Sequence, residues 1–175
     1  DVLSTGSAGS MAFDDTASVR LGLSSATHVL SSVPPVADGD PVLDAYGDLI
    51  TARRDLWIGY LSSTGVYGDT GGAWVDESAP VKGRRGSRNE ADAEWLARGA
   101  RVFRLPGIYG PGRSALDRVR DGKAHRIDLP DQIFSRVHVD DIVSGVIAGF
   151  EGPPGAYNLS DDLPCSQNSV IEHAC

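Results

Sequence analysis

The sequence is poor in cysteine and has no long apolar run. Its two cysteines, Cys165 and Cys175, lie near the C-terminal end, in a spacing that fits neither a disulfide framework nor a zinc site. The longest apolar stretches span a few residues, as at 146–148, whereas a membrane-spanning helix needs roughly 20. The first residues also lack the basic and then apolar pattern of a secretory signal. We therefore expect a cytoplasmic protein without a transmembrane helix.

Positive charge is scarce as well. The chain has 16 Lys and Arg residues against 24 Asp and Glu residues, which gives a formal net charge of -8. Surfaces that hold nucleic acids or anionic membranes concentrate positive charge, so we expect no nucleic-acid and no membrane partner. What the chain does have is length and apolar content, 175 residues of which 41% are hydrophobic. These values are typical of a folded domain with its own core.

Short β-prone segments alternate with helical patterns along the chain. Asp40 and Pro41 form a helix start, an N-cap residue followed by proline, and the apolar positions after them predict a helix of about 13 residues. A second helix is expected over residues 87–97, ending at Gly99. Strands are expected at residues 27–33, 57–62, 101–105, 136–139 and 157–159. This alternation predicts a parallel sheet in which the first three of these strands are adjacent.

The C-terminal part contains two further helical patterns. Asp140 is expected to cap one helix and Ser166 another. The first helix should bury five apolar residues, which are Ile142, Val143, Val146, Ile147 and Phe150. Because Asp140 serves as a cap, the group of His138, Asp140 and Asp141 is not expected to bind a metal. Residues 68–80 are rich in Gly and Asp and lack apolar periodicity, which predicts a long loop.

Four segments carry a recognisable sequence. They are residues 60–68 (YLSSTGVYG), 103–112 (FRLPGIYGPG), 135–142 (SRVHVDDI) and 155–159 (GAYNL). In this order they resemble the extended short-chain dehydrogenase/reductase superfamily, in its NAD-dependent epimerase/dehydratase group. Residues 71–77 (GGAWVDE) are similar to an atypical branch of these NAD(P)-binding proteins.

The resemblance implies an α/β fold, a Rossmann-like doubly wound parallel sheet with part of a small C-terminal substrate domain. Residues 1–150 would form the NAD(P)-binding domain, and residues 151–175 would begin a substrate-binding region. NAD or NADP would lie across the carboxyl ends of the strands. The resemblance further implies a small-molecule substrate. Members often form homodimers, so a homodimer is the assembly to test.

The opening of the chain departs from the family. Members begin with a strand and Gly-x-x-Gly-x-x-Gly, because only glycine lets the backbone approach a pyrophosphate at a helix N-terminus. Residues 5–10 contain Gly6 and Gly9, but no helical pattern is recognisable after them. Either this stretch cradles phosphate or, as we expect, it is a loop and the first strand with its glycine turn lies outside the sequence. The C-terminal end also falls inside an expected helix.

The catalytic pair of the family is absent too. Members carry Tyr-x-x-x-Lys on the helix after the long loop, where the lysine lowers the pKa of the phenol. The register set by residues 76–77 before it and Trp95 after it places this motif near Arg84 and Arg88, where neither Tyr nor Lys is found. Arginine stays protonated near neutral pH and cannot shuttle protons, but its fork of donors can hold a carboxylate or phosphate. The alternative is that Arg84, Arg85 and Arg88 form a solvated helix face.

The resemblance assigns further residues to substrate and cofactor. Ser63 and Thr64 match strand-end hydroxyls that bind the substrate oxygen, although such a hydroxyl can instead bond a neighbouring backbone group. Tyr67 matches a tyrosine that packs rather than reacts. The expected cofactor-binding residues are Ser32, Val33, Pro34, Ser62, Pro106, Gly107 and Ile108. Gly107 stands where the family usually has asparagine, so a substrate hydrogen bond is lost.

Two functions stay open at this point. The first is an NAD(P)-dependent epimerase/dehydratase-like oxidoreductase or isomerase that acts on a small polar metabolite, nucleotide-linked metabolites included. Its catalytic residues would be Ser63, Thr64, Arg84 and Arg88. The second is an NAD(P)-binding protein without turnover, a sensor or interaction module, which the missing Tyr-x-x-x-Lys pair favours.

Overall fold

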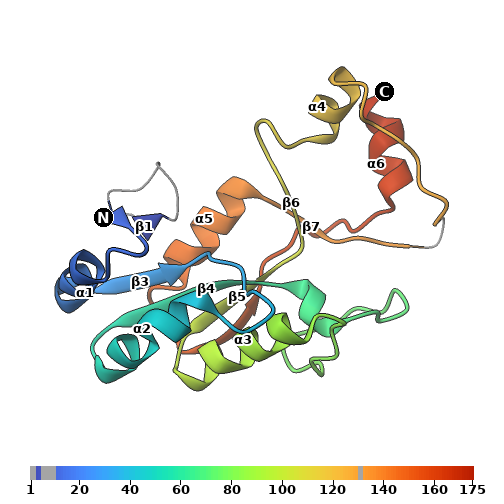
Figure 1. Cartoon of the computed structure of the whole chain (residues 1–175). Coiled ribbons are helices and arrows are strands. Elements are labelled where there is room, and N and C mark those ends of the chain that lie inside the picture. The colour runs from blue at the N-terminus through green and yellow to red at the C-terminus, as the bar shows by residue number, and fades with distance from the viewer. Residues whose placement is uncertain (1–2, 5–10, 130–131) are drawn as a thin grey trace.

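A parallel sheet forms the centre of the molecule. The computed structural model describes residues 3–4, 11–129 and 132–175 (Figure 1). Its main sheet has four strands in the order β3-β4-β5-β8, and each neighbouring pair is parallel. The strands are β3 (His28–Ser31), β4 (Trp57–Ser63), β5 (Arg101–Leu105) and β8 (Gly155–Asn158). The predicted adjacency of the first three strands is therefore confirmed.

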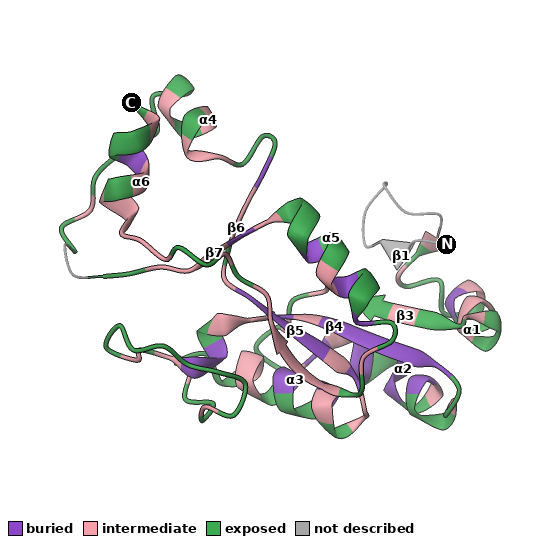
Figure 2. Cartoon of the chain, turned by 180° about the vertical axis from the view of Figure 1, so that it is seen from behind, coloured by how far each residue is buried: buried purple, intermediate pink, exposed green. Residues whose placement is uncertain are grey.

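Helices cover the sheet on two sides. Helices α2 (Pro41–Ala52) and α3 (Gly86–Ala97) lie on one face, and α5 (Val139–Ala148) lies on the other (Figure 1). Successive side chains of a strand point to opposite faces of the sheet, so each strand contributes residues to both cores. Tyr60 of β4 and Val102 of β5 belong to the core against α2 and α3, whereas Trp57 and Phe103 belong to the core under α5. Figure 2 shows the buried residues concentrated in β4 and β5.

The ends of α2 and α3 form as the sequence predicts. Asp40 Oδ1 accepts hydrogen bonds from the backbone N–H groups of Val42 and Leu43, at 2.9 and 3.1 Å, and Pro41 occupies the first turn. The other carboxylate oxygen of Asp40 accepts a 2.8 Å bond from Trp95 Nε1 on α3, so this one side chain caps α2 and joins it to its neighbour. Gly99 follows α3 with a φ of 79°, which leads the chain into β5 without strain.

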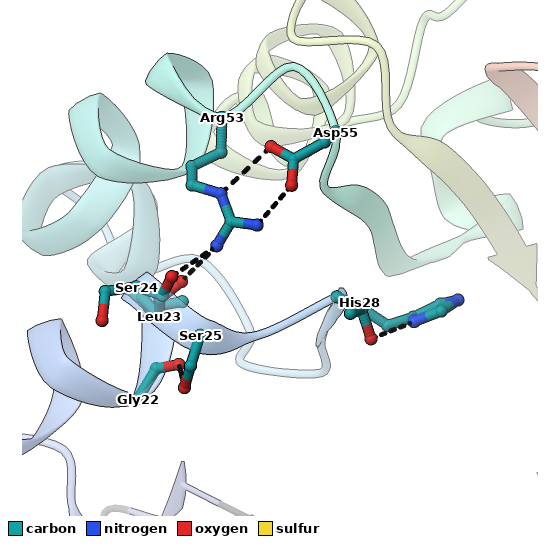
Figure 3. A network of polar contacts seen from close by, with 8 residues as sticks. Gly22, Leu23, Ser24, Ser25, His28, Arg53 and Asp55 are labelled. Atoms are coloured by element: carbon teal, nitrogen blue, oxygen red, sulfur yellow. Dashed lines mark hydrogen bonds and ion pairs between the residues drawn. The ribbon is translucent and has the colours of Figure 1, made fainter.

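The N-terminal part holds a helix that the sequence pattern did not reveal. Helix α1 (Thr16–Ser25) begins after Asp15, whose side chain accepts from Ser18 N–H. Its weak apolar pattern, which buries only Val19, explains why it escaped prediction. Arg53, just after α2, donates to the carbonyl oxygens at the end of α1 and to Asp55 (Figure 3). Two short strands, β1 (Leu3–Ser4) and β2 (Met11–Ala12), pair in parallel nearby. The predicted loop at 5–10 lies outside the described residues.

A second lobe stands beyond the carboxyl ends of the main sheet (Figure 1). Strands β6 (Gly107–Tyr109) and β7 (Arg136–His138) pair in parallel. Helix α4 (Ala115–Arg120) follows β6 and contacts α6 (Gln167–Ala174), which lies near the C-terminal end. Ser166 caps α6 as predicted, whereas β6 and α4 are too short to be recognised in the sequence. Residues 151–175 thus give one strand to the main sheet and one helix to this lobe.

Two expectations about α5 are wrong. The helix begins at Val139, and its cap is His138, whose Nδ1 accepts from Asp140 N–H at 3.2 Å. Asp140 instead lies in the first turn, where its carboxylate faces the positive end of the helix dipole. Ile142 and Val146 are buried, but Val143, Ile147 and Phe150 are exposed. Val143 and Ile147 lie beside the buried stripe, whereas Phe150 lies just beyond the end of α5, with its ring close to those of His28 and Trp57.

None of the helices in the described part of the chain combines the length and the apolar character that crossing a bilayer requires.

Candidate functional site

Polar residues gather where the parallel strands end. All four strands of the main sheet run in the same direction, so their carboxyl ends meet at one edge. In open α/β sheets this edge is where ligands bind. Here the strands are followed by the short helix η1 (Thr64–Tyr67), by the loop from Gly68 to α3, and by the second lobe. The candidate site therefore lies at this edge.

A buried ion pair joins β5 to α3 below the edge. Arg104 donates twice to Asp92, from Nη2 to Oδ1 at 2.7 Å and from Nε to Oδ2 at 3.1 Å, and both side chains are buried. Ser62 Oγ donates to the same carboxylate at 2.7 Å. Burial alone would lower the pKa of Arg104, but hydrogen bonds to Asp92 and Tyr67 outweigh it and raise that pKa above its ordinary value. Arg104 is therefore permanently charged and fixed in place.

Arg104 also begins a chain of hydrogen bonds that connects the ends of the strands. Its Nη1 donates to the Tyr67 hydroxyl at 2.9 Å, and Tyr67 donates in turn to Asn158 Oδ1 at 2.7 Å. The backbone N–H of Asn158 donates to Glu77 Oε1 at 2.7 Å. The network thus ties η1, β5, β8 and the long loop into one unit. Both hydrogen-bonding capacities of the Tyr67 hydroxyl are used, which agrees with a packing role.

Sequence reasoning missed Arg104, Asp92, Glu77 and Asn158. One signal was available, because Arg104 is a charged residue inside a short apolar strand whose other neighbours in the chain are buried. Such a residue needs a buried partner of opposite charge. The identity of that partner, twelve residues earlier on α3, depends on how the helix packs on the sheet.

The predicted substrate-binding hydroxyls lie at the end of β4. Ser63 Oγ accepts a 3.1 Å hydrogen bond from Gly65 N–H and so caps η1. This is the bond to a neighbouring backbone group that the sequence left open as an alternative. It occupies the oxygen as an acceptor and leaves the hydroxyl proton able to donate to a ligand. Thr64, the next residue, is half-buried.

The predicted cofactor-binding residues divide into two groups. Ser32 and Pro34 are exposed after β3, with Val33 half-buried between them, and they line a groove beside that strand. Pro106, Gly107 and Ile108 lie between β5 and β7, where Gly107 is exposed. Ser62 differs from all of these, because its hydroxyl is buried and donates to Asp92. In this arrangement Ser62 offers no free hydroxyl to a cofactor.

The arginines predicted to stand near the family's catalytic positions lie around the start of α3. Arg84 is exposed in the loop, and Arg88 is half-buried in the first turn of the helix. Within the described ranges neither forms an ion pair, and no hydrogen bond joins either to Ser63 or Thr64. Arg88 does act on buried Tyr60, whose pKa is raised to about 12 by burial and by Asp40, against the opposing charge of Arg88.

An acidic cleft of about 530 Å³ separates the strand ends from the second lobe. Its lining includes Tyr109 and three carboxylates, those of Asp141, Asp161 and Asp162, together with Asn158 of the buried network. Burial, and a hydrogen bond with Asp161, raise the pKa of Tyr109 above its ordinary value. None of the predicted catalytic or cofactor residues lines this cleft, so the described chain presents them as separate patches along the same edge.

Comparison with known proteins places this arrangement in context. No family model and no curated protein matches the chain. A conserved protein of unknown function from Silicibacter pomeroyi DSS is 40% identical, with a TM-score of 0.83 over 98% of this chain and 67% of that one. The dTDP-glucose 4,6-dehydratase of Bacillus anthracis str. Ames, in complex with NAD, is 16% identical with a TM-score of 0.76 over 91% of this chain and 60% of that one.

A third solved structure links the sequence to a named group. A candidate NAD-dependent epimerase/dehydratase from Methylobacillus flagellatus is 25% identical, with a TM-score of 0.59 over 75% of this chain and 51% of that one. The chain thus spans between 51% and 67% of the length of these three proteins. The 25% identity to this named epimerase/dehydratase, the shared parallel sheet and the four sequence segments together identify the superfamily. The chain belongs to the extended short-chain dehydrogenase/reductase superfamily, in its NAD-dependent epimerase/dehydratase group.

Proposed function

We propose that this chain acts as an NAD(P)-dependent enzyme of the epimerase/dehydratase type on a small polar metabolite. The observation that supports the proposal is that polar strand ends, with a serine hydroxyl proton free to donate, lie along the edge of a parallel sheet where such folds bind ligands. The B. anthracis dehydratase, which shares this fold, is in complex with NAD. Nucleotide-linked sugars are therefore the first substrate class to test.

The residues fit part of a dinucleotide. Exposed Ser32 and Pro34 leave backbone and hydroxyl groups free beside β3, and Pro106 to Ile108 form the wall where β5 ends. Pyrophosphate binding needs a glycine-rich turn between a strand and a helix, and the described residues hold no such turn. This chain would therefore contact the nicotinamide half of NAD or NADP, a group that supplies hydride transfer when bound.

Ser63 and Thr64 are the groups proposed to contact the substrate. Ser63 Oγ is held in place by Gly65 N–H, so its proton can be donated to a substrate oxygen without a change in its position. Arg84 and Arg88 would contribute positive charge near a developing alkoxide. Neither can take up the proton, because arginine remains protonated. The proposed chemistry is therefore slower than that of a Tyr–Lys enzyme.

A second function is favoured by one observation. The Tyr67 hydroxyl, the phenol at the end of β4, is bonded on both sides, so it is not free to take the role of the proton-transferring pair whose positions are predicted to hold Arg84 and Arg88. A protein of this kind would bind NAD(P) and respond to it without turnover.

One experiment separates the two functions. The protein is incubated with NAD or NADP and a panel of UDP- and dTDP-linked sugars, and products are followed by NMR while nicotinamide absorbance at about 340 nm reports net reduction. New sugar signals that disappear in a Ser63→Ala, Thr64→Val double variant, and persist in a Ser144→Ala control on exposed α5, support the enzyme. Cofactor binding by calorimetry with no product from any sugar supports the binding protein instead.

A further inference from the structure

Positive charge, which is scarce in this chain, is concentrated at the start of helix α3. Four of the 16 Lys and Arg residues lie within positions 82–88, whereas the chain as a whole has a formal net charge of -8. They are Lys82, Arg84, Arg85 and Arg88. The first three are exposed and Arg88 is half-buried. We call residues 82–88 the basic segment.

The four cations of the basic segment are not neutralised by neighbouring acids. In residues 3–4, 11–129 and 132–175 none of them forms an ion pair. A carboxylate does come close to the first turn of α3, because Oε1 of Glu90 would lie 3.9 Å from a Cβ on Gly86. Like charges held together repel one another, and an anion bound among them offsets this repulsion.

The first turn of α3 adds positive potential of its own. Arg85 is the N-cap residue, its side chain makes no capping hydrogen bond, and the turn contains no acidic residue. The leading N–H groups of the helix therefore receive no acceptor from the cap position, and the helix dipole concentrates partial positive charge there. Exposed N–H groups beside guanidinium groups are a combination that holds carboxylates and phosphates.

Backbone contacts fix the basic segment against the end of β4. The N–H groups of Lys82 and Gly83 both donate to the carbonyl oxygen of Val66 in η1, at 2.8 and 2.7 Å. A Cβ on Gly83 would clash with the Gly65 carbonyl oxygen, so only glycine permits this approach. Gly65 is also the residue whose N–H bonds to Ser63 Oγ. The basic segment thus lies beside the residues that hold the hydroxyl proposed to contact the substrate.

We propose that the basic segment binds an oxyanion, a carboxylate or a phosphate, of the same small molecule that Ser63 contacts. Arg84 and Arg85 supply charge-assisted hydrogen bonds, and the first-turn N–H groups of α3 supply further donors. The acidic cleft, which is connected to η1 by the bond between Tyr67 and Asn158, carries three carboxylates that oppose an anion. The separation of the two charges along one edge therefore orients the ligand.

This charge pattern narrows the substrate class. It favours small polar metabolites that carry an oxyanion close to the reacting carbon, which are sugar acids and sugar phosphates. Naming this ligand as the substrate rests on the proposed function, whereas the binding of an oxyanion by the basic segment does not.

NMR titration of the full 175-residue chain tests the anion site. Inorganic phosphate and malonate are the probes, one for each kind of oxyanion, at constant ionic strength. We expect the amide signals of Gly86 and Ser87 to shift and saturate with phosphate, with malonate or with both. Binding of phosphate alone assigns the site to sugar phosphates, and binding of malonate alone assigns it to sugar acids. An Arg84→Gln, Arg85→Gln double variant should weaken binding at least about tenfold, because two charges next to the anion are lost.

Two further variants separate a local site from the net charge. The Arg20→Gln, Arg54→Gln double variant makes the same change in net charge in α1 and between α2 and β4, and it should keep the affinity of the parent. Glu90→Gln removes the carboxylate near the first turn of α3 and should tighten binding by about two- to fivefold. These substitutions alter exposed side chains, so an unchanged melting temperature verifies that each variant is folded.

Three results would overturn the proposal. The first is the absence of saturable shifts with both probes, and the second is equal weakening in the two double variants. The third is a salt-sensitive dimer, seen by light scattering and lost in the Arg84→Gln, Arg85→Gln variant, because an acidic surface of a second copy would then be the anion. None of these measurements needs turnover. The anion site can therefore fail while the sugar assay succeeds, and the sugar assay can fail while phosphate or malonate still binds.

Discussion

Arg104 and Asp92 face each other in the core through two hydrogen bonds, 2.7 and 3.1 Å long, with almost no contact with solvent. Asp92→Asn would leave the guanidinium buried without its counter-charge. We expect the free energy of unfolding to fall by about 3–5 kcal/mol, the usual cost of breaking a buried pair on one side. Urea unfolding followed by circular dichroism measures this.

Ser62→Ala is the matched control for that change. It removes one donor to the same carboxylate but leaves the ion pair intact, so it should cost only about 1 kcal/mol. Equal losses for Asp92→Asn and Ser62→Ala would show that the charge of Asp92 matters no more than a single hydrogen bond.

Tyr60 gives a prediction about alkaline pH. Burial, with help from Asp40, raises the pKa of its phenol to about 12, above the ordinary value of 10. Between these two values the unfolded chain loses this proton while the folded chain keeps it. The stability that Tyr60 contributes is therefore fully present below pH 10 and is lost as the pH rises from 10 to about 12.

Tyr60→Phe should remove that part of the pH dependence. Among residues 3–4, 11–129 and 132–175 the Tyr60 hydroxyl has no hydrogen-bond partner, so at neutral pH the variant should be as stable as the parent or slightly more stable. Tyr67→Phe is the contrasting variant, because it breaks bonds to Arg104 and Asn158 and should cost about 1–3 kcal/mol. Thermal unfolding of both variants across the pH range measures these changes in stability. A large loss for Tyr60→Phe at neutral pH would reveal an unrecognised partner.

Two buried glycines should respond to alanine in opposite ways. A Cβ on Gly59 would lie 2.4 Å from a ring carbon of Trp57 and 2.8 Å from Leu30 Cδ1, so Gly59→Ala should cost about 1–3 kcal/mol through overpacking. A Cβ on Gly47, within α2, would meet nothing closer than 3.7 Å. Gly47→Ala should therefore stabilise the protein by about 0.5–1 kcal/mol. Chemical unfolding of the two variants side by side measures both, and a shared sign would contradict the packing described for Trp57.

Local sequence signals predicted most of the helices and strands, but they did not predict contacts between residues that belong to different elements. Asp40 followed by Pro41 marks a helix start by itself, and apolar runs identify the strands. The pairing of Asp92 with Arg104 depends on a helix folding back over a sheet, which periodicity does not encode. The apolar character of Val143 and Ile147 predicted burial, and this prediction was wrong, because whether another element covers that side of the helix is a property of the tertiary structure. The site residues taken from the resemblance remain predictions.

Cofactor binding by the 175 residues alone should be weak. The described residues provide no glycine turn whose amides could neutralise the pyrophosphate, and the cleft at the strand ends carries three carboxylates that oppose an anion. Isothermal titration calorimetry with NAD and NADP should give either no heat or a dissociation constant well above the low micromolar range. Tight binding would mean that residues 5–10 or another loop cradle the phosphates.

The last prediction concerns the hydroxyls at the end of β4. If turnover rests on donation from Ser63 and Thr64, the Ser63→Ala, Thr64→Val double variant should lose most activity per folded molecule. Without a proton-transferring pair the parent itself should be about 10²–10⁴-fold slower than enzymes that have one, so activity is slow but measurable.

Ser63 also caps η1, and its loss should cost about 0.5–2 kcal/mol, which is why rates must be normalised to the folded fraction. Tyr67→Phe, normalised in the same way, should keep nearly full activity, because its hydroxyl is already held by Arg104 and Asn158. The opposite ranking, with Tyr67→Phe the damaging change, would show that this phenol leaves its network to transfer the proton and that the serine and threonine only hold the strand end.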